Sequence, residues 1–263
     1  MSKLKRLYSK FLIPEVFSFS EAENYCNSKT LHGYQSKLLC KYRFHKLDDY
    51  LKKEGSLFRG PSTNILLYCI SYYLHLNEGR FPNLIDFGGA CGENILFLES
   101  LFGKELIKKS FILESFAQSL ESKNWEFAKR LNFSDDLFEI LGNEIDIFFT
   151  SCALNYIPNP YDVLLSIAKK KVTLICLTRN IFSSNPKAFI QVSDLSENGL
   201  GEHLDEYGNP LIWYPSQTLC ENEIKNIFLT SNYELIFDEN IVNKGVVEAS
   251  KNYSKDLIFY FKD

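Results

Sequence analysis

The chain has 263 residues, of which 45% are hydrophobic and 24% are charged, a composition typical of a globular protein that buries a sizeable core without staples. Its formal net charge of −4 provides no overall attraction for nucleic acid. The seven cysteines are scattered and form no C-x-x-C pair, which indicates reduced thiols and argues against a zinc site or a disulfide framework. We therefore expect a cytoplasmic protein with no bound metal.

The N-terminal segment is basic over residues 1–10, but Pro14 and Glu15 interrupt the apolar stretch that follows it. That stretch is too short for the core of a signal peptide, and no run of 18 apolar residues occurs elsewhere. We expect no integral membrane segment. The basic residues are interpreted as a solvated tail, with a weak peripheral contact to anionic lipid as the alternative.

Residues 1–80 are predicted to form a helical extension. Ser18 and Glu21 fit a capping box at the start of a short helix. Apolar residues then recur at helical spacing over 34–53 and again over 62–77, so each of these helices has one face suited to burial. The aromatic residues on these faces are interpreted as core.

From residue 81 to 263, short apolar segments alternate with helical patterns, as in an α/β domain. Near-continuous apolar runs are typical of strands that are covered on both faces, which predicts a parallel sheet. Residues 181–215 are rich in Asn, Ser, Gly and Pro and are predicted to be a long excursion from the sheet. The predicted strands are 84–85, 111–113, 145–149, 172–177, 233–237 and 257–261. The predicted helices include 94–102, 161–169 and one that begins at a capping box over Thr218–Glu221.

A glycine-rich turn follows the first predicted strand, in the order strand, acid, turn, helix. Glycine adds no Cβ and tolerates positive φ, so the backbone of such a turn can approach a small ligand closely. The glycines stand two, three and six residues after Asp86, at Gly88, Gly89 and Gly92. This spacing does not meet the dinucleotide pattern G-x-G-x-x-G, which disfavours an NAD-linked sugar enzyme and leaves a D-x-G-x-x-x-G skeleton.

Three further segments accompany the turn in chain order. Glu114 closes the second strand, 22 residues after Gly92; Asn132–Asp135 follow at the third strand, and Asp146–Pro160 cover the fourth strand and its loop. Together with Asp86–Gly92, these segments resemble the class I S-adenosylmethionine (SAM)-dependent methyltransferases. The resemblance implies a doubly wound, Rossmann-like, seven-stranded mixed sheet with an N-terminal helical extension, and SAM as the cofactor.

A narrower resemblance extends over residues 17–238. The stretch Ser151-Cys-Ala-Leu-Asn-Tyr-Ile-Pro-Asn-Pro-Tyr161 is similar to one in a family of bacterial proteins that are assigned as methyltransferases and are often associated with surface-polysaccharide gene clusters. Segments 17–22 and 178–191 also resemble that family. The resemblance implies SN2 methyl transfer to an oxygen of a sugar, a glycan or another small acceptor, and places 181–215 on the acceptor side.

Two positions depart from the pattern of this family. Ala90 stands where the middle glycine of the turn is usual, which narrows the turn slightly. Asn180 stands where the family usually has proline, which changes the expected shape of the acceptor side and leaves the cofactor side unaffected.

The resemblance implies cofactor-binding roles at the carboxyl ends of the first four strands. A carboxylate at Glu114 can accept hydrogen bonds from both ribose hydroxyls. Asp135 is less specific, because Asp136 beside it could serve equally well. Tyr34 and Arg59 belong to the helical extension that could cover the cofactor, with packing as the alternative. The implied cofactor-binding residues are Asp86, Gly88, Gly89, Ala90, Gly92, Glu114, Ser134, Asp135, Ser151, Cys152 and Ala153.

Three residues are candidates for a catalytic role. His203 lies in the 181–215 excursion and is the candidate general base, with a bystander loop histidine as the alternative. Arg179, predicted at the carboxyl end of the fifth strand, could pair with a phosphate or carboxylate of the substrate or form only a surface salt bridge. Tyr156 belongs to the loop that the resemblance places beside the methyl donor.

We therefore expect a SAM-dependent methyltransferase whose partners are small-molecule or glycan acceptors and not nucleic acid. The methyl donor is already activated, so alignment of acceptor, methyl group and sulfur supplies much of the rate. The alternative is a binding or regulatory protein with a catalytically degenerate methyltransferase fold, which Ala90 and the lack of an obvious base support. The sequence does not indicate an oligomeric state.

Overall fold

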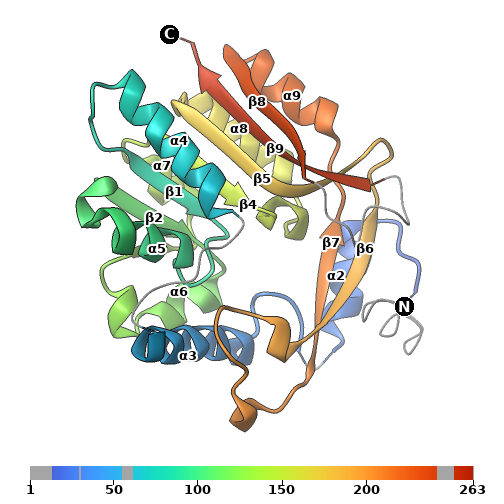
Figure 1. Ribbon diagram of the computed structural model, residues 1–263. Coiled ribbons are helices and arrows are strands. Elements are labelled where there is room, and N and C mark those ends of the chain that lie inside the picture. Colours follow the sequence, from blue (N-terminus) through green and yellow to red (C-terminus); the bar gives the residue numbers. More distant parts are fainter. Residues whose placement is uncertain (1–13, 30, 55–61, 242–251, 263) are drawn as a thin grey trace.

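A seven-stranded sheet forms the centre of the computed structural model (Figure 1). The basic segment 1–10 and Arg59 lie outside the residues that the structure describes. The described residues are 14–29, 31–54, 62–241 and 252–262. In chain order the strands of this sheet are β1 (Asn83–Phe87), β2 (Lys109–Leu113), β3 (Asn132–Ser134), β4 (Ile147–Ser151), β5 (Leu174–Ser183), β8 (Tyr233–Ile241) and β9 (Asn252–Phe261).

The strand order is β3-β2-β1-β4-β5-β9-β8. Strands β1 to β5 are parallel, whereas β9 runs antiparallel to both of its neighbours, β5 and β8. The sheet grows from β1 in two directions, so a switch point lies between β1 and β4. In sheets of this kind ligands bind outside the carboxyl ends of the strands at the switch point. This mixed seven-stranded sheet confirms the predicted fold class.

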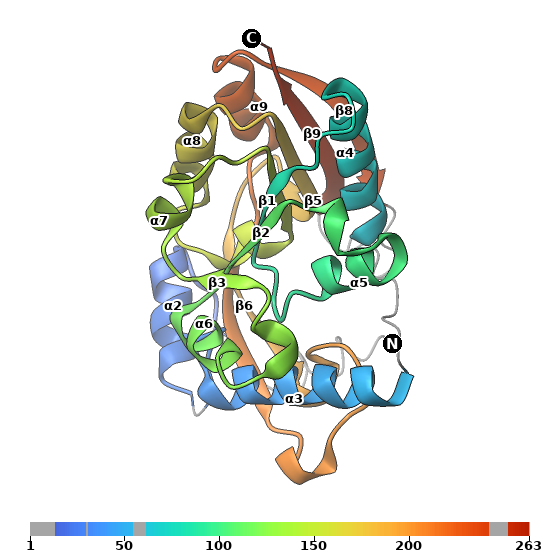
Figure 2. The same cartoon turned by 90° about the vertical axis from the view of Figure 1, so that its left-hand side faces the viewer.

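Helices cover both faces of the sheet, so its strands are apolar almost throughout (Figure 2). All five residues of β1 are buried, as both faces of a central parallel strand require. Among the described residues, no helix is both long and apolar enough to cross a membrane. One face carries α4 (Thr63–Leu76) and α5 (Glu93–Phe102); the other carries α7 (Leu137–Leu141), α8 (Pro160–Lys170) and α9 (Glu221–Leu229).

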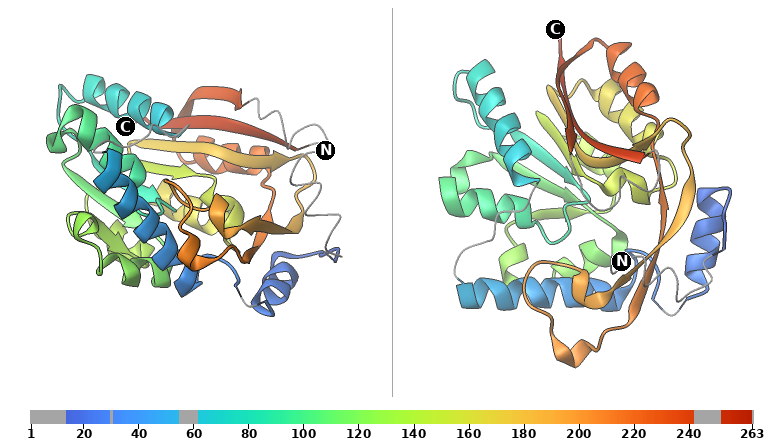
Figure 3. Two further views of the ribbon diagram at one scale, coloured as in Figure 1. Left: turned by 60° about the horizontal axis from the view of Figure 1, so that its bottom comes forward. Right: turned by 45° about the vertical axis from the view of Figure 1, so that its right-hand side comes forward.

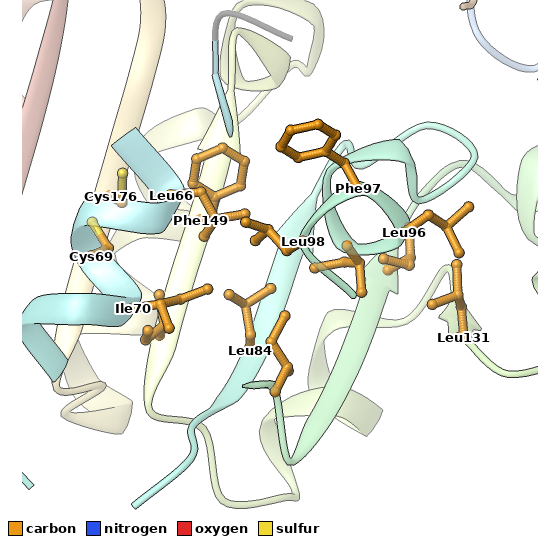
Figure 4. Packing of buried hydrophobic residues seen from close by; sticks show 14 of the residues in the cluster. Leu66, Cys69, Ile70, Leu84, Leu96, Phe97, Leu98, Leu131, Phe149 and Cys176 are labelled. Carbon is orange, nitrogen blue, oxygen red and sulfur yellow. The ribbon is translucent and has the colours of Figure 1, made fainter. Parts of the chain in front are cut away.

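The core beneath α4 shows how packing fixes the sheet (Figure 4). Leu66, Cys69 and Ile70 of α4 are fully buried in one cluster with Leu84 of β1 and Phe149 of β4. Each such large apolar side chain contributes about 1.5–3 kcal/mol on burial. The cluster therefore holds the adjacent strands β1 and β4 in place, and with them the turn that follows β1.

The other α-helices of the described residues are α2 (Phe19–Asn27), α3 (Lys37–Glu54) and α6 (Phe116–Ser122). Helix α3 packs against α6, and α2 packs against strands outside the main sheet. Ser18 caps α2, as predicted, by accepting a hydrogen bond from the Glu21 N–H at 3.2 Å. The Glu21 carboxylate completes the box by binding the N–H of the residue before the cap.

A second sheet of two antiparallel strands, β6 (Ala188–Asp194) and β7 (Leu211–Gln217), forms a ribbon that runs from the main sheet toward α3 (Figure 3). The sequence predicted that residues 181–215 form an excursion from the sheet, but it did not predict the two paired strands that form there. Pro215 sits within β7 opposite Ile190, and a proline inside a short apolar run argues against a strand when only the sequence is considered. Here the proline is tolerated because the ribbon has only two strands.

The start of α9 corrects a second prediction. The capping box over Thr218–Glu221 is wrong: Cys220 is the N-cap of α9, and no side chain caps that end among the described residues. The Thr218 hydroxyl instead accepts a hydrogen bond from the Lys187 N–H at 2.9 Å. This tertiary bond ties the end of β7 to the start of β6 and uses the oxygen that a capping box would need.

Candidate functional site

A cavity of about 810 Å³ opens at the carboxyl ends of β1, β2, β4 and β5, next to the switch point of the sheet. One part of its wall comes from the strand ends and the loops that follow them. The other part comes from residues 23–43, which include α2 and the start of α3, and from Pro215 of the ribbon. The cavity is thus enclosed by segments from distant parts of the sequence.

The glycine-rich turn after β1 is closely packed, and its first glycine, Gly88, lines the cavity. Gly88 has φ +70°, and a Cβ added to it would lie 2.2 Å from the Cβ of Ala153. A Cβ on Gly89 would lie 2.6 Å from Cγ of Asp86. Ala90 also adopts a left-handed conformation, with φ 54°, which costs an L-residue about 1–2 kcal/mol. The two glycines are therefore required by close approach, whereas Ala90 adopts the glycine-like backbone at a cost.

Glu114 lies at the end of β2 with both of its carboxylate oxygens fixed. Its Oε1 accepts a hydrogen bond from the Ala90 N–H at 2.8 Å, and its Oε2 accepts one from the Ser115 N–H at 3.0 Å. A carboxylate offers about four acceptor sites, so each oxygen can still accept a hydroxyl donor. The side chain lines the cavity. Glu114 joins the turn after β1 to the end of β2, together with the hydrogen bond from the Gly88 N–H to the Leu113 carbonyl at 2.8 Å.

Asp86 is buried at the end of β1, with 1% of its surface exposed. Burial raises the pKa of its carboxyl to about 7; the hydrogen bond from Asn94 opposes this shift, and the nearby Glu93 and Glu114 add to it. The Asp86 carboxyl, at the base of the turn, therefore changes its charge near neutral pH.

Arg43 of α3 interacts electrostatically with Glu93 and Glu114 of this acidic region. Burial alone would lower the pKa of its guanidinium, but Cys91, Glu114 and Glu93 outweigh that effect and raise it. Arg43 lines the cavity, so its charge balances the acidic turn from the opposite side. The sequence did not indicate this residue, because its position on a helix face gives no signal for a contact with acids that stand far away in the chain, at Glu93 and Glu114.

The structure distinguishes the two neighbouring acids after β3. Asp136 is the N-cap of α7 and accepts hydrogen bonds from the N–H groups of Phe138 and Glu139 at 2.8 and 3.2 Å. Asp135 instead lines the cavity. Ser134 donates to Glu139 at 2.8 Å and lines a different hollow of about 540 Å³ at the β3 edge of the sheet.

The end of β4 provides the other side of the cavity. Ser151, Cys152 and Ala153 all line it. The Ser151 hydroxyl lies 2.6 Å from that of Ser62, next to α4. Cys152 has φ 64°, and its N–H donates to the Thr178 carbonyl of β5 at 2.9 Å. The chain therefore turns sharply here, which brings Ala153 against Gly88.

Tyr156 lies in the cavity wall, where its hydroxyl donates to Oε1 of Gln191 in β6 at 2.9 Å. Burial raises the pKa of Tyr156 far above its usual value, so the phenol remains protonated. Its ring packs edge-on against Tyr34, which also lines the cavity, with centroids 5.3 Å apart. These contacts connect the loop after β4 to the ribbon.

The structure places the histidines differently from the expectation. His203 does not line the cavity; its Nδ1 lies 2.9 Å from the Tyr42 hydroxyl, where the tip of the ribbon meets α3. His32 does line the cavity, and its Nδ1 lies 3.2 Å from the Lys29 carbonyl. No local pattern distinguishes His32 from the other histidines. Its neighbour Gly33 donates its N–H to the Trp213 carbonyl of the ribbon.

Comparison with solved structures identifies the fold. The crystal structure of a SAM-dependent methyltransferase from Clostridium acetobutylicum ATCC 824 matches with a TM-score of 0.50 and 10% sequence identity, over 84% of this chain and 99% of that one. The chain has the class I methyltransferase fold. Magnesium protoporphyrin IX methyltransferase from Synechocystis PCC 6803 matches with a TM-score of 0.47 and 9% identity, over 89% of this chain and 100% of that one. No family model and no curated protein matches the sequence.

Most of the predicted residues meet around one cavity of this fold. Asp86, Gly89, Ala90 and Gly92 shape the turn behind the wall and do not line the cavity themselves. Ser134 and His203 lie elsewhere, and the sequence did not single out Arg43 or His32. The predicted site residues that line the cavity are Gly88, Glu114, Asp135, Ser151, Cys152, Ala153, Tyr156 and Arg179, together with Tyr34 from the helical extension.

Proposed function

We propose that this protein is a SAM-dependent methyltransferase. The observation that carries the proposal is the Glu114 carboxylate, which the N–H groups of Ala90 and Ser115 fix in the wall of the cavity, next to the Gly88 turn. The fixed Glu114 carboxylate can accept hydrogen bonds from the two hydroxyls of a nucleoside ribose. The backbone at Gly88 beside it has no side chain, so a ligand can approach it closely. The class I fold supports the same reading, because its known structures include the methyltransferase from Clostridium acetobutylicum.

The residues in the cavity fit SAM along its length. Glu114 would hold the ribose hydroxyls, and Asp135, at the end of β3, would lie on the adenine side. Gly88 would let the backbone approach the cofactor, since a Cβ there already meets Ala153. Ser151 and Cys152 would flank it at the end of β4. When bound, SAM supplies a methyl group on a sulfonium that a nucleophile can displace.

The chain itself would contribute alignment, exclusion of water and control of one proton. Tyr156 remains protonated and donates to Gln191, so it positions the cavity wall and does not serve as a base. Among the described histidines, His32 is the one that lines the cavity, and it would take the proton of a hydroxyl acceptor. His203, the candidate base from the sequence, is used in packing against Tyr42.

The acceptor would be a small molecule or the end of a glycan, methylated at oxygen. A volume of about 810 Å³ lies in the usual range of small-molecule sites and has to hold both the cofactor and the acceptor group. The oxygen atom and the association with surface polysaccharides rest on the sequence resemblance and remain predictions, as do the cytoplasmic location and the division of the chain near residue 80.

Methyl transfer can be tested with SAM that is isotopically labelled in the methyl group. The protein is incubated with a panel of sugars, sugar phosphates and phenols, and the products are read by mass spectrometry. A mass gain of one methyl group in place of hydrogen, with formation of S-adenosylhomocysteine (SAH), is the expected result. Folded protein that binds SAH but transfers no methyl group to any acceptor in the panel would favour the catalytically degenerate binding protein.

A further inference from the structure

Strand β5 contains a bulge at the mouth of the cavity. The pairing register with β9 shifts between Leu177 and Asn180, so Thr178 and Arg179 together stand opposite the single residue Asp256. This is the two-against-one arrangement of a β-bulge, which reorients side chains and is frequent next to active sites. Arg179 has φ 59° and is therefore in the left-handed conformation.

Asp256 of β9 stabilises this bulge through hydrogen bonds. Its Oδ1 accepts hydrogen bonds from the Thr178 hydroxyl and, at 3.3 Å, from the Arg179 N–H. The carboxylate thus binds the backbone of Arg179. A non-glycine residue in the left-handed region costs about 1–2 kcal/mol, and such strain persists only where the surrounding structure fixes it. Asp256 is the group that fixes it here.

The bulge turns the Arg179 side chain into the cavity while its neighbours stay buried. Arg179 is exposed, whereas Thr178 and Asn180 on either side have at most 1% of their surface exposed. Its side chain lines the cavity, and among the described residues its guanidinium has no hydrogen-bond or ion-pair partner. The other arginine of the cavity wall, Arg43, is already balanced by Glu114 and Glu93.

Arg179 lies far from the nucleoside side of the cavity. The order β2-β1-β4-β5 places three strand spacings between Glu114 and Arg179, which is about 14 Å at roughly 4.8 Å per strand. On the cavity side Arg179 lies next to the end of β4, where its charge offsets part of the effect of burial on the pKa of Cys152. Its free guanidinium therefore belongs to the half of the cavity that the acceptor would enter.

We propose that Arg179 forms an anion-binding subsite, so that the acceptor carries a phosphate or a carboxylate group. The inference rests on the proposed function, because the acceptor half is defined relative to the cofactor half. A guanidinium binds either group through two parallel hydrogen bonds, which would orient the acceptor as well as attract it. Asp256 is a positioning residue for this subsite.

Glu23, an acidic residue of the cavity wall that has no role in the proposed cofactor site, has to be considered. Glu23 of α2 is exposed and lines the cavity, so its carboxylate faces the space that an anionic acceptor would use. If Arg179 served only to neutralise Glu23, an anion would gain nothing from the arginine. If Arg179 binds the acceptor, removal of the Glu23 charge leaves anion binding unchanged or strengthens it.

The test uses phenyl phosphate and benzoate as anionic probes and benzyl alcohol as their neutral counterpart. Binding to the full-length protein is measured by calorimetry, with and without saturating SAH, for the wild type and for Arg179→Gln, Arg179→Gly and Glu23→Gln. Arg179→Gly keeps the bulge because glycine accepts the left-handed conformation. Glu23→Gln is the matched control on the opposite wall.

We expect at least one anionic probe to bind the wild type about tenfold or more tightly than benzyl alcohol, since a charge-assisted pair contributes about 1.5–3 kcal/mol. Both Arg179 variants should lose this preference, whereas Glu23→Gln should keep it. Phosphate and carboxylate acceptors are distinguished by which probe binds more tightly.

Three results would overturn the subsite: no preference for either anion in the wild type, the same preference in the Arg179 variants, or a loss of SAH affinity in those variants that equals the loss of probe affinity. The last would assign Arg179 to the cofactor. Failure of the wild type to bind SAH at all counts against the proposed function, while the probe series without SAH still tests the anion preference.

Discussion

At the scale of single residues, the turn after β1 combines a buried acid with glycines that have no room for a side chain. Burial raises the pKa of the Asp86 carboxyl to about 7. A Cβ added to Gly88 or Gly89 would lie 2.2 or 2.6 Å from the nearest atom, which is too close for a non-bonded contact. Neither feature favours folding, since a buried charge and a left-handed turn both cost free energy. Such costs concentrate at binding sites.

Asp86→Asn should therefore stabilise the protein, and more so at high pH. The folded state raises the pKa of Asp86 above its ordinary value of 3.8, so this group lowers stability progressively as pH rises from about 4 to about 7 and fully above that. Asparagine removes the effect. A tenfold change in proton affinity corresponds to about 1.4 kcal/mol, so a gain of a few kcal/mol is expected at pH 8 and little at pH 4. Thermal melts of both proteins across this range measure it, and an equal shift at both pH values would contradict the assignment.

Gly88→Ala should destabilise the turn through contact and not only through backbone strain. The new Cβ would meet Ala153 at 2.2 Å, whereas at Gly79, with φ +81°, a Cβ meets nothing within 4 Å. Gly79→Ala is therefore the matched control for the cost of a positive φ. We expect Gly88→Ala to cost about 1–3 kcal/mol more than the control in chemical denaturation. Equal losses would show that Ala153 can move away.

At the scale of elements, the β6–β7 ribbon is attached to α3 by a buried lysine. Lys46 has 3% of its surface exposed, and its ammonium donates to the carbonyls of Ser196, Asn198 and Gly199 at 3.0–3.1 Å. The backbones also approach closely, since a Cβ on Gly201 would lie 2.8 Å from the Lys46 carbonyl. The contact closes the far end of the ribbon onto the helix that supplies Arg43 to the cavity.

Lys46→Met should release this end of the ribbon. Methionine has similar length but leaves the three carbonyls without their donor, at a cost of about 1–3 kcal/mol or more in the free energy of unfolding. Amide hydrogen exchange should rise over residues 195–204 while the strands of the main sheet stay protected. Lys41→Met, at an exposed position of the same helix, is the control and should change neither quantity. Unchanged exchange in Lys46→Met would mean that apolar contacts alone hold the ribbon.

The sequence predicted the strands and helices of the main sheet better than the ribbon, for a physical reason. Buried parallel strands such as β1 are apolar throughout and can be recognised locally. Strand β7 includes Pro215 and owes its structure to pairing with β6 and to packing against α2, contacts between residues far apart in the chain. The capping box at Thr218 failed for the same reason, because a tertiary hydrogen bond competes for its hydroxyl.

The residues of the candidate site show the same difference between positions that a local pattern predicts and positions that depend on long-range contacts. Residues that a strand end places directly, such as Glu114 and Asp135, line the cavity, and their cofactor-binding role stays a prediction. His203 and Arg43 depend on how α3 meets the ribbon and the glycine-rich turn, which no local pattern encodes. Long-range contacts therefore decided which histidine faces the cavity and added Arg43 to the predicted Arg179.

At the scale of the whole molecule, three separate parts of the chain enclose one cavity: the carboxyl ends of the parallel strands, residues 23–43, and the ribbon. The sheet positions the acids and the turn that would bind SAM. The other two parts contribute Tyr34, Arg43, His32 and Pro215, which would close the site around an acceptor. In the proposed arrangement the carboxyl ends of the strands would bind the cofactor, and the acceptor would lie between Arg179 of β5 and the segments that cover the sheet.

The most direct test of the central claim is a calorimetric titration of the protein with SAH, for the wild type and for Glu114→Gln. The wild type should bind one SAH per chain. The variant should bind about 10- to 100-fold more weakly, because hydrogen bonds to a charged group contribute about 1.5–3 kcal/mol and an amide cannot accept from both ribose hydroxyls while keeping its two backbone donors. Thermal melts establish that both proteins are folded. Absence of SAH binding by folded wild-type protein, or equal affinity in the variant, would contradict the account.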